Sequence, residues 1–304
     1  MAAHNVQTKR DIVKVLQYVG EGDTVTTPSN YGAAITSPTF IAVGKVTDIN
    51  LQPDIQHSDT DVLGNEDLID SVKTGENYTF QTTFEMINTT LIDFAFSASG
   101  GGTDSIDESL TFMFSEYISG TEHYTAMYGC RPTSCTITLE RGIWIANMTF
   151  ICKEITQPNT TSPWSGSTPT HASETSTATM SHSGAGADPF TWNSTVYENA
   201  RFSTTVTRGM AVQAVNGTNQ IIYCKASTRR IDFTADIFVE TITLEADWLA
   251  KTSRSAGMSI STSPDDDLAF TGCVITSHNR QKTASNTDAY RESITARAEG
   301  VSIT

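Results

Sequence analysis

Two stretches of the chain alternate between apolar and polar residues. Residues 77–87 read NYTFQTTFEMI, and residues 230–240 read RIDFTADIFVE. Successive side chains of a β-strand point to opposite faces, so this alternation predicts two half-buried strands. The apolar positions include Tyr78, Phe80 and Phe84 in the first strand and Ile231, Phe233 and Ile237 in the second.

A short helical stretch follows each alternating strand, at residues 87–99 and 241–253. In both stretches an Asp precedes an aromatic residue, at Asp93 and at Asp247. Core packing against the strands accounts for the large apolar side chains of these helices without a ligand. The side chains expected to pack in this way are Phe94, Phe96, Trp248 and Leu249.

A motif G-C-x-x-T-S occurs twice, at residues 129–134 and 272–277, and closing strands follow it each time. An earlier strand, at residues 40–51 or 201–212, precedes each alternating strand. The same order of strands, helix and motif on both flanks of the chain predicts an internal duplication. The alternative is a pair of unrelated β-rich halves that share common turn chemistry.

A segment rich in Thr, Ser and Gly separates the two flanks. Residues 156–187 contain one charged residue, Glu174, and almost no periodicity, which is typical of a linker or a long surface loop. The chain is therefore divided into an N-terminal arm (1–39), a first domain (40–155), a linker (156–190) and a second domain (191–304).

The charge of the chain is strongly acidic and unevenly distributed. The 304 residues include 19 Lys and Arg against 34 Asp and Glu, a net charge of −15. Tight binding to nucleic-acid phosphates needs clustered basic residues, so this balance argues against it. Residues 52–76, expected as a long connection between two strands, are markedly acidic, whereas the corresponding residues 213–228 are nearly neutral.

Motifs that carry chemistry are missing from the sequence. The five Cys residues have no CxxC spacing, the six His residues are scattered, and no phosphate-binding or catalytic motif occurs. We therefore expect buried, reduced cysteines, no metal, no cofactor and no enzymatic activity. An apolar run long enough for a membrane-spanning helix is also missing, and the first residues do not follow the order of a signal peptide.

The strings VGKVTDINL, GENYTFQTTFEMI and YGCRPTSCTITLERGIWIANMTFICKEI, with the short helix between them, resemble one domain of a tail tube protein. These proteins belong to long-tailed, siphovirus-like viruses of bacteria and archaea. A second such domain begins at about Asn199. The resemblance implies a mainly β fold with two tandem tail-tube-like domains of the β-sandwich or barrel-forming type, each with a long hairpin and one short helix.

The same resemblance implies a structural role. Tail tube subunits form six-fold rings whose hairpins join into a β-barrel around a channel, and the stacked rings let the viral genome pass into the host. Two domains in each chain favour a ring of three chains, and a ring of six chains with one domain outside is the competing arrangement.

Partners and location also come from the resemblance. It implies contacts with further copies of the chain, with other tail proteins at the tube ends and with viral DNA passing through the bore without tight binding. It implies no membrane insertion, synthesis in the host cytoplasm and a place in the virion tail. Two alternatives stay open, a carbohydrate-binding or adhesive β-sandwich protein and a terminator or cap ring of the same fold.

Two sets of residues acquire candidate roles from this resemblance. The barrel hairpin candidates are Tyr78, Phe80, Phe84, Ile231, Phe233 and Ile237. The candidates for contacts between rings are Asp54, Asp59, Asp61, Glu66, Asp67 and Asp70, because they lie in the long acidic connection attached to the first hairpin.

Overall fold

A computed structural model describes most of the chain. The described residues are 15–21, 31–33, 35, 38, 40–60, 70–96, 108–118, 121–140, 142–156, 158–161, 180, 190–214, 221–238, 243–262, 265–281 and 291–303.

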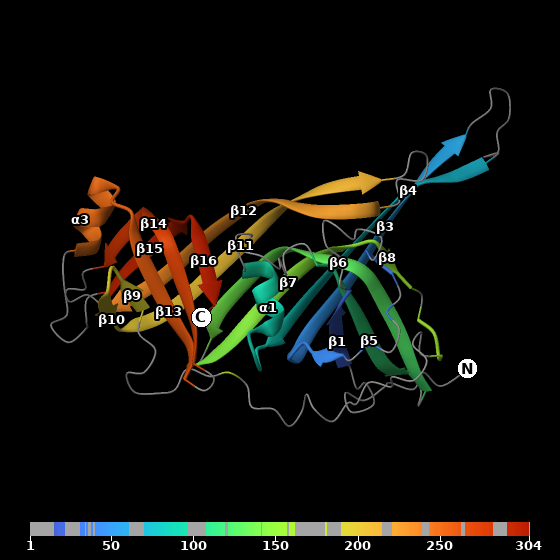
Figure 1. The fold of residues 1–304 in the computed structure, drawn as a ribbon, viewed down its shortest axis with the longest axis horizontal. Helices are drawn as coiled ribbons and strands as arrows, with labels where there is room; N and C mark the ends of the chain where they lie inside the picture. Colours follow the sequence, from blue (N-terminus) through green and yellow to red (C-terminus); the bar gives the residue numbers. More distant parts are fainter. Residues whose placement is uncertain are drawn as a thin grey trace, which may run out of the picture.

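The described residues form strands and two short helices, as expected for a mainly β protein (Figure 1). The first half of the chain contains β1 (Val15–Gly20), β2 (Ile41–Ala42), β3 (Lys45–Thr60), β4 (Asp70–Glu85), α1 (Thr90–Phe96), β5 (Leu110–Ile118), β6 (Thr121–Glu140), β7 (Ile143–Cys152) and β8 (Glu154–Ile155). The second half contains β9 (Phe190–Trp192), β10 (Thr195–Tyr197), β11 (Asn199–Ala214), β12 (Ile221–Phe238), α3 (Thr243–Ala250), β13 (Arg254–Thr262), β14 (Asp265–Gln281), β15 (Arg291–Ala298) and β16 (Gly300–Ile303).

The strands of the two halves pair in the same order. In the first half the order is β2-β1-β5-β6-β7-β4-β3, and in the second it is β10-β9-β13-β14-β15-β12-β11, with every pair antiparallel. The short strand β8 adds to β6 as β16 adds to β14. Each half also has one long hairpin, β3–β4 or β11–β12, and one short helix.

The G-C-x-x-T-S motif lies where a long strand changes its partner. Gly129 and Gly272 have φ angles of 62° and 64°, a left-handed conformation that favours Gly, because a Cβ atom would be strained there. A β-bulge follows at Thr133 in β6 and at Thr276 in β14. Each Thr hydroxyl donates to a carbonyl of the neighbouring strand, over 3.0 Å in the first half and 3.1 Å in the second. The motif therefore builds the same bend twice.

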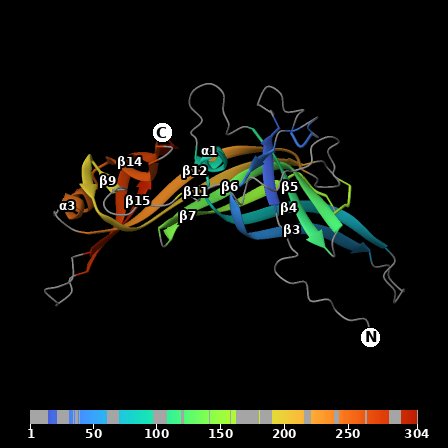
Figure 2. The same cartoon turned by 90° about the horizontal axis from the view of Figure 1, so that it is seen from below.

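The two halves share one continuous sheet. Strand β11 pairs with β6 from Ser203 opposite Thr138 to Thr207 opposite Ser134. This contact joins four strands of each half into the order β14-β15-β12-β11-β6-β7-β4-β3. Figure 2 shows the long central strands crossing the molecule as one curved layer, with α1 against it.

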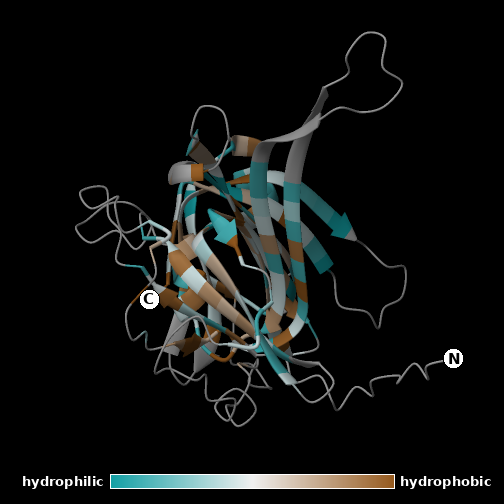
Figure 3. Ribbon diagram, turned by 90° about the vertical axis from the view of Figure 1, so that its right-hand side faces the viewer, coloured by the Kyte–Doolittle hydropathy of each residue, from teal (hydrophilic) through white to brown (hydrophobic). Residues whose placement is uncertain are grey.

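One face of this sheet is apolar and supports a core that extends through both halves. Hydrophobic and hydrophilic residues alternate along the strands (Figure 3). Phe80 stacks on Phe150 with ring centroids 5.1 Å apart, and Trp144 meets Phe202 edge to face across the junction of the halves at 6.3 Å. Burial of each such side chain contributes about 1.5–3 kcal/mol. All six barrel hairpin candidates (Tyr78, Phe80, Phe84, Ile231, Phe233 and Ile237) are buried on this face of β4 and β12.

The two hairpins are longer than the alternation predicts. Residues 52–76 were expected as a connection, but β3 continues to Thr60 and β4 begins at Asp70. In the second half, β11 and β12 likewise extend into residues 213–228. That expectation was wrong because strand pairing uses backbone N–H and C=O groups, so an acidic segment without apolar alternation still pairs. In Figure 1 the β3–β4 hairpin projects beyond the rest of the sheet.

Segments expected as arm and linker also contribute to the fold. Strand β1, from the N-terminal 39 residues, pairs with β5 and buries Leu16 and Tyr18. Met180, from the segment at 156–190, is buried, and its N–H donates to the carbonyl of Met86 over 2.7 Å. The remaining parts of these two segments lie largely outside the described residues.

Both expected helices form, but one of their side chains is not where we expected it. Phe96 is buried, and Phe94 and Trp248 are half-buried, in agreement with core packing. Leu249 was expected in the core and is 68% exposed, so this expectation was wrong. Burial of the five cysteines as free thiols agrees with the sequence analysis.

Candidate assembly surface

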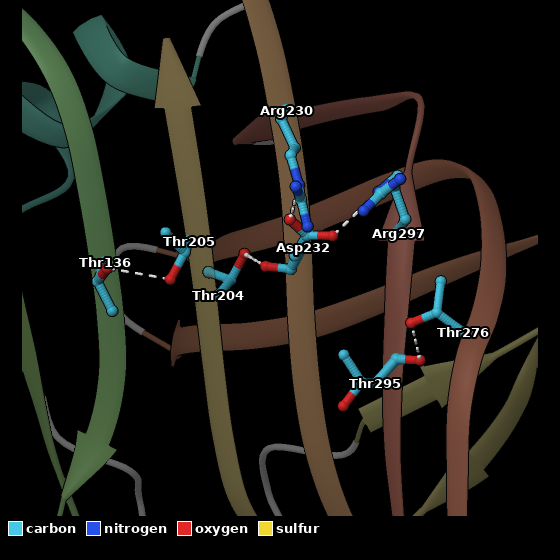
Figure 4. A network of polar contacts seen from close by, with 8 residues as sticks. All are labelled: Thr136, Thr204, Thr205, Arg230, Asp232, Thr276, Thr295 and Arg297. Atoms are coloured by element: carbon cyan, nitrogen blue, oxygen red, sulfur yellow. Dashed lines mark hydrogen bonds and ion pairs between the residues drawn. The ribbon is translucent and has the colours of Figure 1, made fainter.

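The face of the eight-stranded sheet opposite the core is covered by short polar side chains. At the junction of the halves, the Thr136 and Thr205 hydroxyls are 3.0 Å apart (Figure 4). The hydroxyls of Thr138 and Ser203 are 3.1 Å apart. These cross-strand pairs join β6 to β11 on the polar face, in addition to the backbone ladder.

The polar contacts continue on both sides of the junction. Asn147 on β7 donates from Nδ2 to the Thr83 hydroxyl over 2.8 Å and accepts from Gln81 Nε2 over 3.0 Å. In the second half, the Thr234 and Thr295 hydroxyls lie 3.4 Å apart. Uncharged hydrogen-bonding groups therefore extend across this face from β4 to β15.

One charged group on this face is well defined. Asp232 accepts from Arg230 Nε over 2.5 Å and from Arg297 Nε over 3.1 Å (Figure 4). Burial acts to raise the pKa of Asp232, but the hydrogen bonds and charges of the two guanidinium groups outweigh it and hold the pKa below its usual value. The carboxylate is neutralised locally by its two neighbours.

Within the described residues, the sheet has two edges without a partner strand, at β3 and at the end of β14. These two strands correspond to β11 and β6, which pair with each other at the junction of the halves. Strand β3 pairs with β4 alone, and the end of β14 at residues 277–281 pairs with β15 alone. Ile49 and Leu51 on β3 are half-buried, whereas Phe202 and Thr204, at the corresponding positions of β11, are buried by β6 and its surroundings. Edge strands expose unpaired backbone groups that suit addition of another strand.

An ionic cluster lies at the open edge of β14. Glu292 is fully buried, with Arg280 Nε 3.0 Å from Oε1 and His278 Nε2 3.4 Å from Oε2. Arg280 also reaches Glu245 of α3 over 3.4 Å, and His278 stacks on Trp248 with ring centroids 5.6 Å apart. Inward-pointing charges of this kind occur where natural proteins protect an edge strand.

Two arginines of the second half bind the C-terminal end of α1 in the first half. Arg208 on β11 donates from Nε and Nη2 to the carbonyl of Ala95 over 2.9 and 2.6 Å. Arg229 on β12 donates from Nη1 to the carbonyl of Phe96 over 2.7 Å. The last carbonyls of a helix lack intrahelical partners, and cations stabilise this end. Sequence reasoning missed both arginines, although Arg208 and Arg229 continue the core-facing positions of their strands.

The predicted inter-ring acids are only partly described. Asp54 is exposed on β3. Asp59 and Asp70 belong to the far ends of β3 and β4, where the backbone pairs Asp59 with Ser71 and Thr60 with Asp70. Asp61, Glu66 and Asp67 lie outside the described residues.

Within the described residues, no group of three or more His, Cys, Asp or Glu side chains is arranged to hold a metal ion. The same residues contain no helix that is long and apolar enough to span a membrane.

The fold defines the class first: a mainly β protein whose two halves build one antiparallel sheet with a polar face. The family model described as "Phage tail tube protein" matches residues 14–300. The chain belongs to this family and is therefore a viral structural protein, a component of the virion tail tube.

The solved structure of Hcp1 from Flavobacterium johnsoniae is similar at 13% identity and a TM-score of 0.26, over 38% of this chain and 93% of that chain. The comparison with curated proteins gives no match.

Proposed function

We propose that this chain is the ring-forming subunit of a siphovirus-like tail tube and that it carries two copies of one tube unit. Three chains close a ring of six units, the rings stack, and the genome passes through the bore during ejection. The observation that carries the proposal is the β6–β11 pairing, because it joins the two halves side by side through sheet edges that each half presents.

The junction within the chain supplies a template for the junction between chains. Strand β3 occupies the place of β11 and leaves its outer edge open, and β14 occupies the place of β6. The β-bulge at Thr47 in β3 corresponds to the one at Ala200 in β11, and the β-bulge at Thr133 in β6 corresponds to the one at Thr276 in β14. Counting from these bulges aligns the strands of the two halves residue by residue. The register that follows places Asn50 opposite Gln281, Leu51 opposite Arg280, Gln52 opposite Asn279, Pro53 opposite His278 and Asp54 opposite Ser277 of the next chain.

The side chains of this register suit such a pairing. Gln52 and Asn279 are exposed and take the places of Thr205 and Thr136, whose hydroxyls join the halves. Two amides opposite each other form a cross-strand hydrogen bond, as the hydroxyls do. Pro53 cannot donate a backbone hydrogen bond, which fits a strand at the edge of the isolated subunit. Closure of the ring removes the open edges of every chain.

The polar face of the sheet lines the bore in this arrangement. Thr, Ser, Asn and Gln side chains that hydrogen-bond one another offer little attraction to phosphate, and the guanidinium groups of Arg230 and Arg297 are engaged by Asp232. DNA then slides past without the multiple ionic contacts that tight binding requires. The β3–β4 hairpin, which carries Asp54, Asp59 and Asp70, projects toward the next ring.

Disulfide trapping tests the ring and its register. We expect Gln52→Cys/Asn279→Cys to form a bond between chains, since opposite residues of an antiparallel pair have Cα atoms about 4.5–5.5 Å apart. Thr136→Cys/Thr205→Cys is the positive control within one chain. Asn50→Cys/Ser277→Cys, which is out of register, is the matched negative control. The five native cysteines are buried and do not compete at the surface.

Native mass spectrometry and electron microscopy of the same protein give the assembly. A ring of about 99 kDa, three times the 32.9 kDa chain, and tubes with a regular axial repeat are expected. A ring of about 197 kDa indicates six chains, and single rings that never stack indicate a cap or terminator. Tubes without the Gln52–Asn279 bond contradict the proposed register, and a dispersed monomer that binds glycans contradicts the tube function.

A further inference from the structure

The two helices that the structure describes, α1 and α3, end in different environments. The last residues of α1, Ala95 and Phe96, are 1% and 0% exposed, because α1 lies between β6 of its own half and β11 and β16 of the other. Two guanidinium groups close that end through the carbonyls of both residues. The covered end of α1 is therefore part of the junction within the chain.

The corresponding end of α3 is open in the isolated chain. Aligned on the Asp-aromatic pair of each helix, Leu249 corresponds to Ala95, yet it is 68% exposed. Ala250 is exposed as well, and Lys251, at φ 50°, closes the helix with its N–H on the carbonyl of Trp248. The two helices therefore differ at corresponding positions, because the other half of the chain covers Ala95 whereas Leu249 stays largely uncovered in the described part of the isolated chain.

The template junction identifies the elements of the next chain that reach α3. Ile55 on β3 takes the place of Arg208, and Glu76, which pairs with Ile55, takes the place of Arg229. Strand β8 takes the place of β16, with Glu154 where β16 has Gly300, next to the guanidinium of Arg229. The elements of the next chain that we expect at α3 are therefore β3, β4 and β8 of its first half.

The basic residue lies on a strand at the junction within the chain and on the helix at the proposed junction between chains. Where the second half presents Arg229 to α1, the first half presents two carboxylates, Glu76 and Glu154. Both carboxylates act on Tyr78, whose hydroxyl donates to Glu76 Oε2 over 3.1 Å and whose pKa is raised by burial and then by the charge of Glu154. The helix that they face ends in the cation Lys251. At the proposed junction between chains, Lys251 of the helix therefore faces the carboxylates of Glu76 and Glu154.

We propose that the exposed end of α3, Leu249 to Lys251, docks against β4 and β8 of the next chain, with the Lys251 ammonium between the carboxylates of Glu76 and Glu154. This inference rests on the proposed ring, and it adds a contact outside the β3–β14 ladder. The occupant is a second copy of this chain, chosen by continuity with the junction within the chain and by charge complementarity.

Charge reversal tests the contact with the full-length protein. Lys251→Glu is expected to raise the concentration of chain at half assembly about tenfold, because it places a third carboxylate beside Glu76 and Glu154. The combination of Lys251→Glu with Glu76→Lys/Glu154→Lys restores opposite charges and is expected to return this concentration to within about threefold of the unchanged chain. Glu116→Lys is the matched control and is expected to leave assembly unchanged, because Glu116 lies on β5 opposite His123, outside the residues that pair at either junction. Assembly is measured by sedimentation velocity over a concentration series.

Two additional measurements separate the possible failures. Leu249→Asp is expected to weaken assembly about tenfold while the thermal unfolding of the dilute monomer stays unchanged, because this side chain is solvent-exposed there. Disulfide trapping at Gln52 and Asn279 reports on the ring itself. If trapping succeeds and Lys251→Glu or Leu249→Asp assembles normally, the α3 contact is overturned and the ring stands. If trapping fails with the unchanged helix and native mass spectrometry finds no ring, the ring proposal fails.

Discussion

The covered edge of β6 and the open edge of β14 have the same backbone and opposite chemistry. Counted from the shared bulge, Cys135 and Ile137 correspond to His278 and Arg280, and Ala146 on β7 corresponds to Glu292 on β15. The three residues of the first half are fully buried and apolar, and β11 covers their edge. The three residues of the second half form an ionic cluster at an edge that pairs with no described strand.

The difference shows how an edge is matched to what covers it. An edge that is covered during folding of the same chain is permanently dry, so apolar residues stabilise it most. An edge that meets solvent before it meets a partner exposes apolar residues to unspecific pairing, and charges reduce this hazard at some cost in stability. The same topology therefore has a buried apolar edge at β6, which β11 covers, and an edge protected by charged side chains at β14.

The largest effect is expected when the chemistry of the open edge is moved to the covered one. Ile137→Arg places a charge at a fully buried position without a carboxylate partner and is expected to lower the free energy of unfolding by about 3–5 kcal/mol. Urea unfolding of the dilute protein measures it. The control is Thr234→Arg, an exposed position on β12, with an expected change within about 0.5 kcal/mol. A small loss in Ile137→Arg contradicts a sealed junction.

The converse exchange gives an effect of opposite sign. Replacing the whole ionic cluster by apolar residues, in His278→Val/Arg280→Ile/Glu292→Ala, is expected to leave the stability unchanged or raise it by about 1–4 kcal/mol. Arg280→Ile alone leaves the carboxylate of Glu292 buried without its closest cation and is expected to destabilise the chain. The triple variant should associate unspecifically, which light scattering detects. A triple variant that stays as monodisperse as the unchanged chain contradicts the protective role of the cluster.

The smallest effect is expected at two matching aspartates, and it depends on pH. Burial acts to raise the pKa of Asp247, but hydrogen bonds from Arg254 and from Trp192 Nε1, both 2.9 Å long, outweigh it and lower the pKa. The stability contributed by Asp247 is therefore present above the ordinary Asp pKa of 3.8 and is lost as the pH falls below it. Asp93 has its pKa raised by burial, so its ionised form is disfavoured in the fold and protonation in acid relieves this.

Asn substitutions separate the two signs. Asp247→Asn is expected to cost about 1 kcal/mol at pH 7 and progressively less as the pH falls below 3.8, because the unfolded chain then takes up a proton more readily than the native carboxylate and the stability contributed by Asp247 is lost. Asp93→Asn is expected to stabilise the chain at pH 7 and to lose this advantage in acid. Urea unfolding of both variants and the unchanged chain at each pH measures the differences. Two variants with the same sign at pH 7 would contradict the assigned environments.

Much of the architecture was predictable because each signal was local. Alternation located the core-facing residues of β4 and β12, and the spacing of Gly129 to Thr133 reflects a bend that needs a left-handed glycine followed by a bulge. Asp beside an aromatic residue marked both helices. Such features are set by neighbours within a few residues, so a single sequence contains them.

Other features depend on partners that are distant in sequence. The full length of the hairpins was missed, since pairing through the backbone leaves no pattern in an acidic segment. The exposure of Leu249 was missed because its helix has the same pattern as α1 and differs in what lies against it. The alternation of β11 places Arg208 on the core-facing side of the strand, but its contact with the carbonyl of Ala95 depends on the distant β6–β11 pairing.

For the ring proposed above, the β6–β11 pairing also has a consequence for the kinetics of assembly. Since one polypeptide contributes both strands, their encounter is governed by an effective concentration set by the tether and not by the amount of protein in the cell. In the proposed ring of three chains, half of the six junctions are β6–β11 pairings, which form within each chain regardless of dilution. The other half are β3–β14 pairings between chains, so they form only above a threshold in chain concentration. Substitutions confined to β3 or β14 can therefore move that threshold while the β6–β11 junction within each chain stays intact.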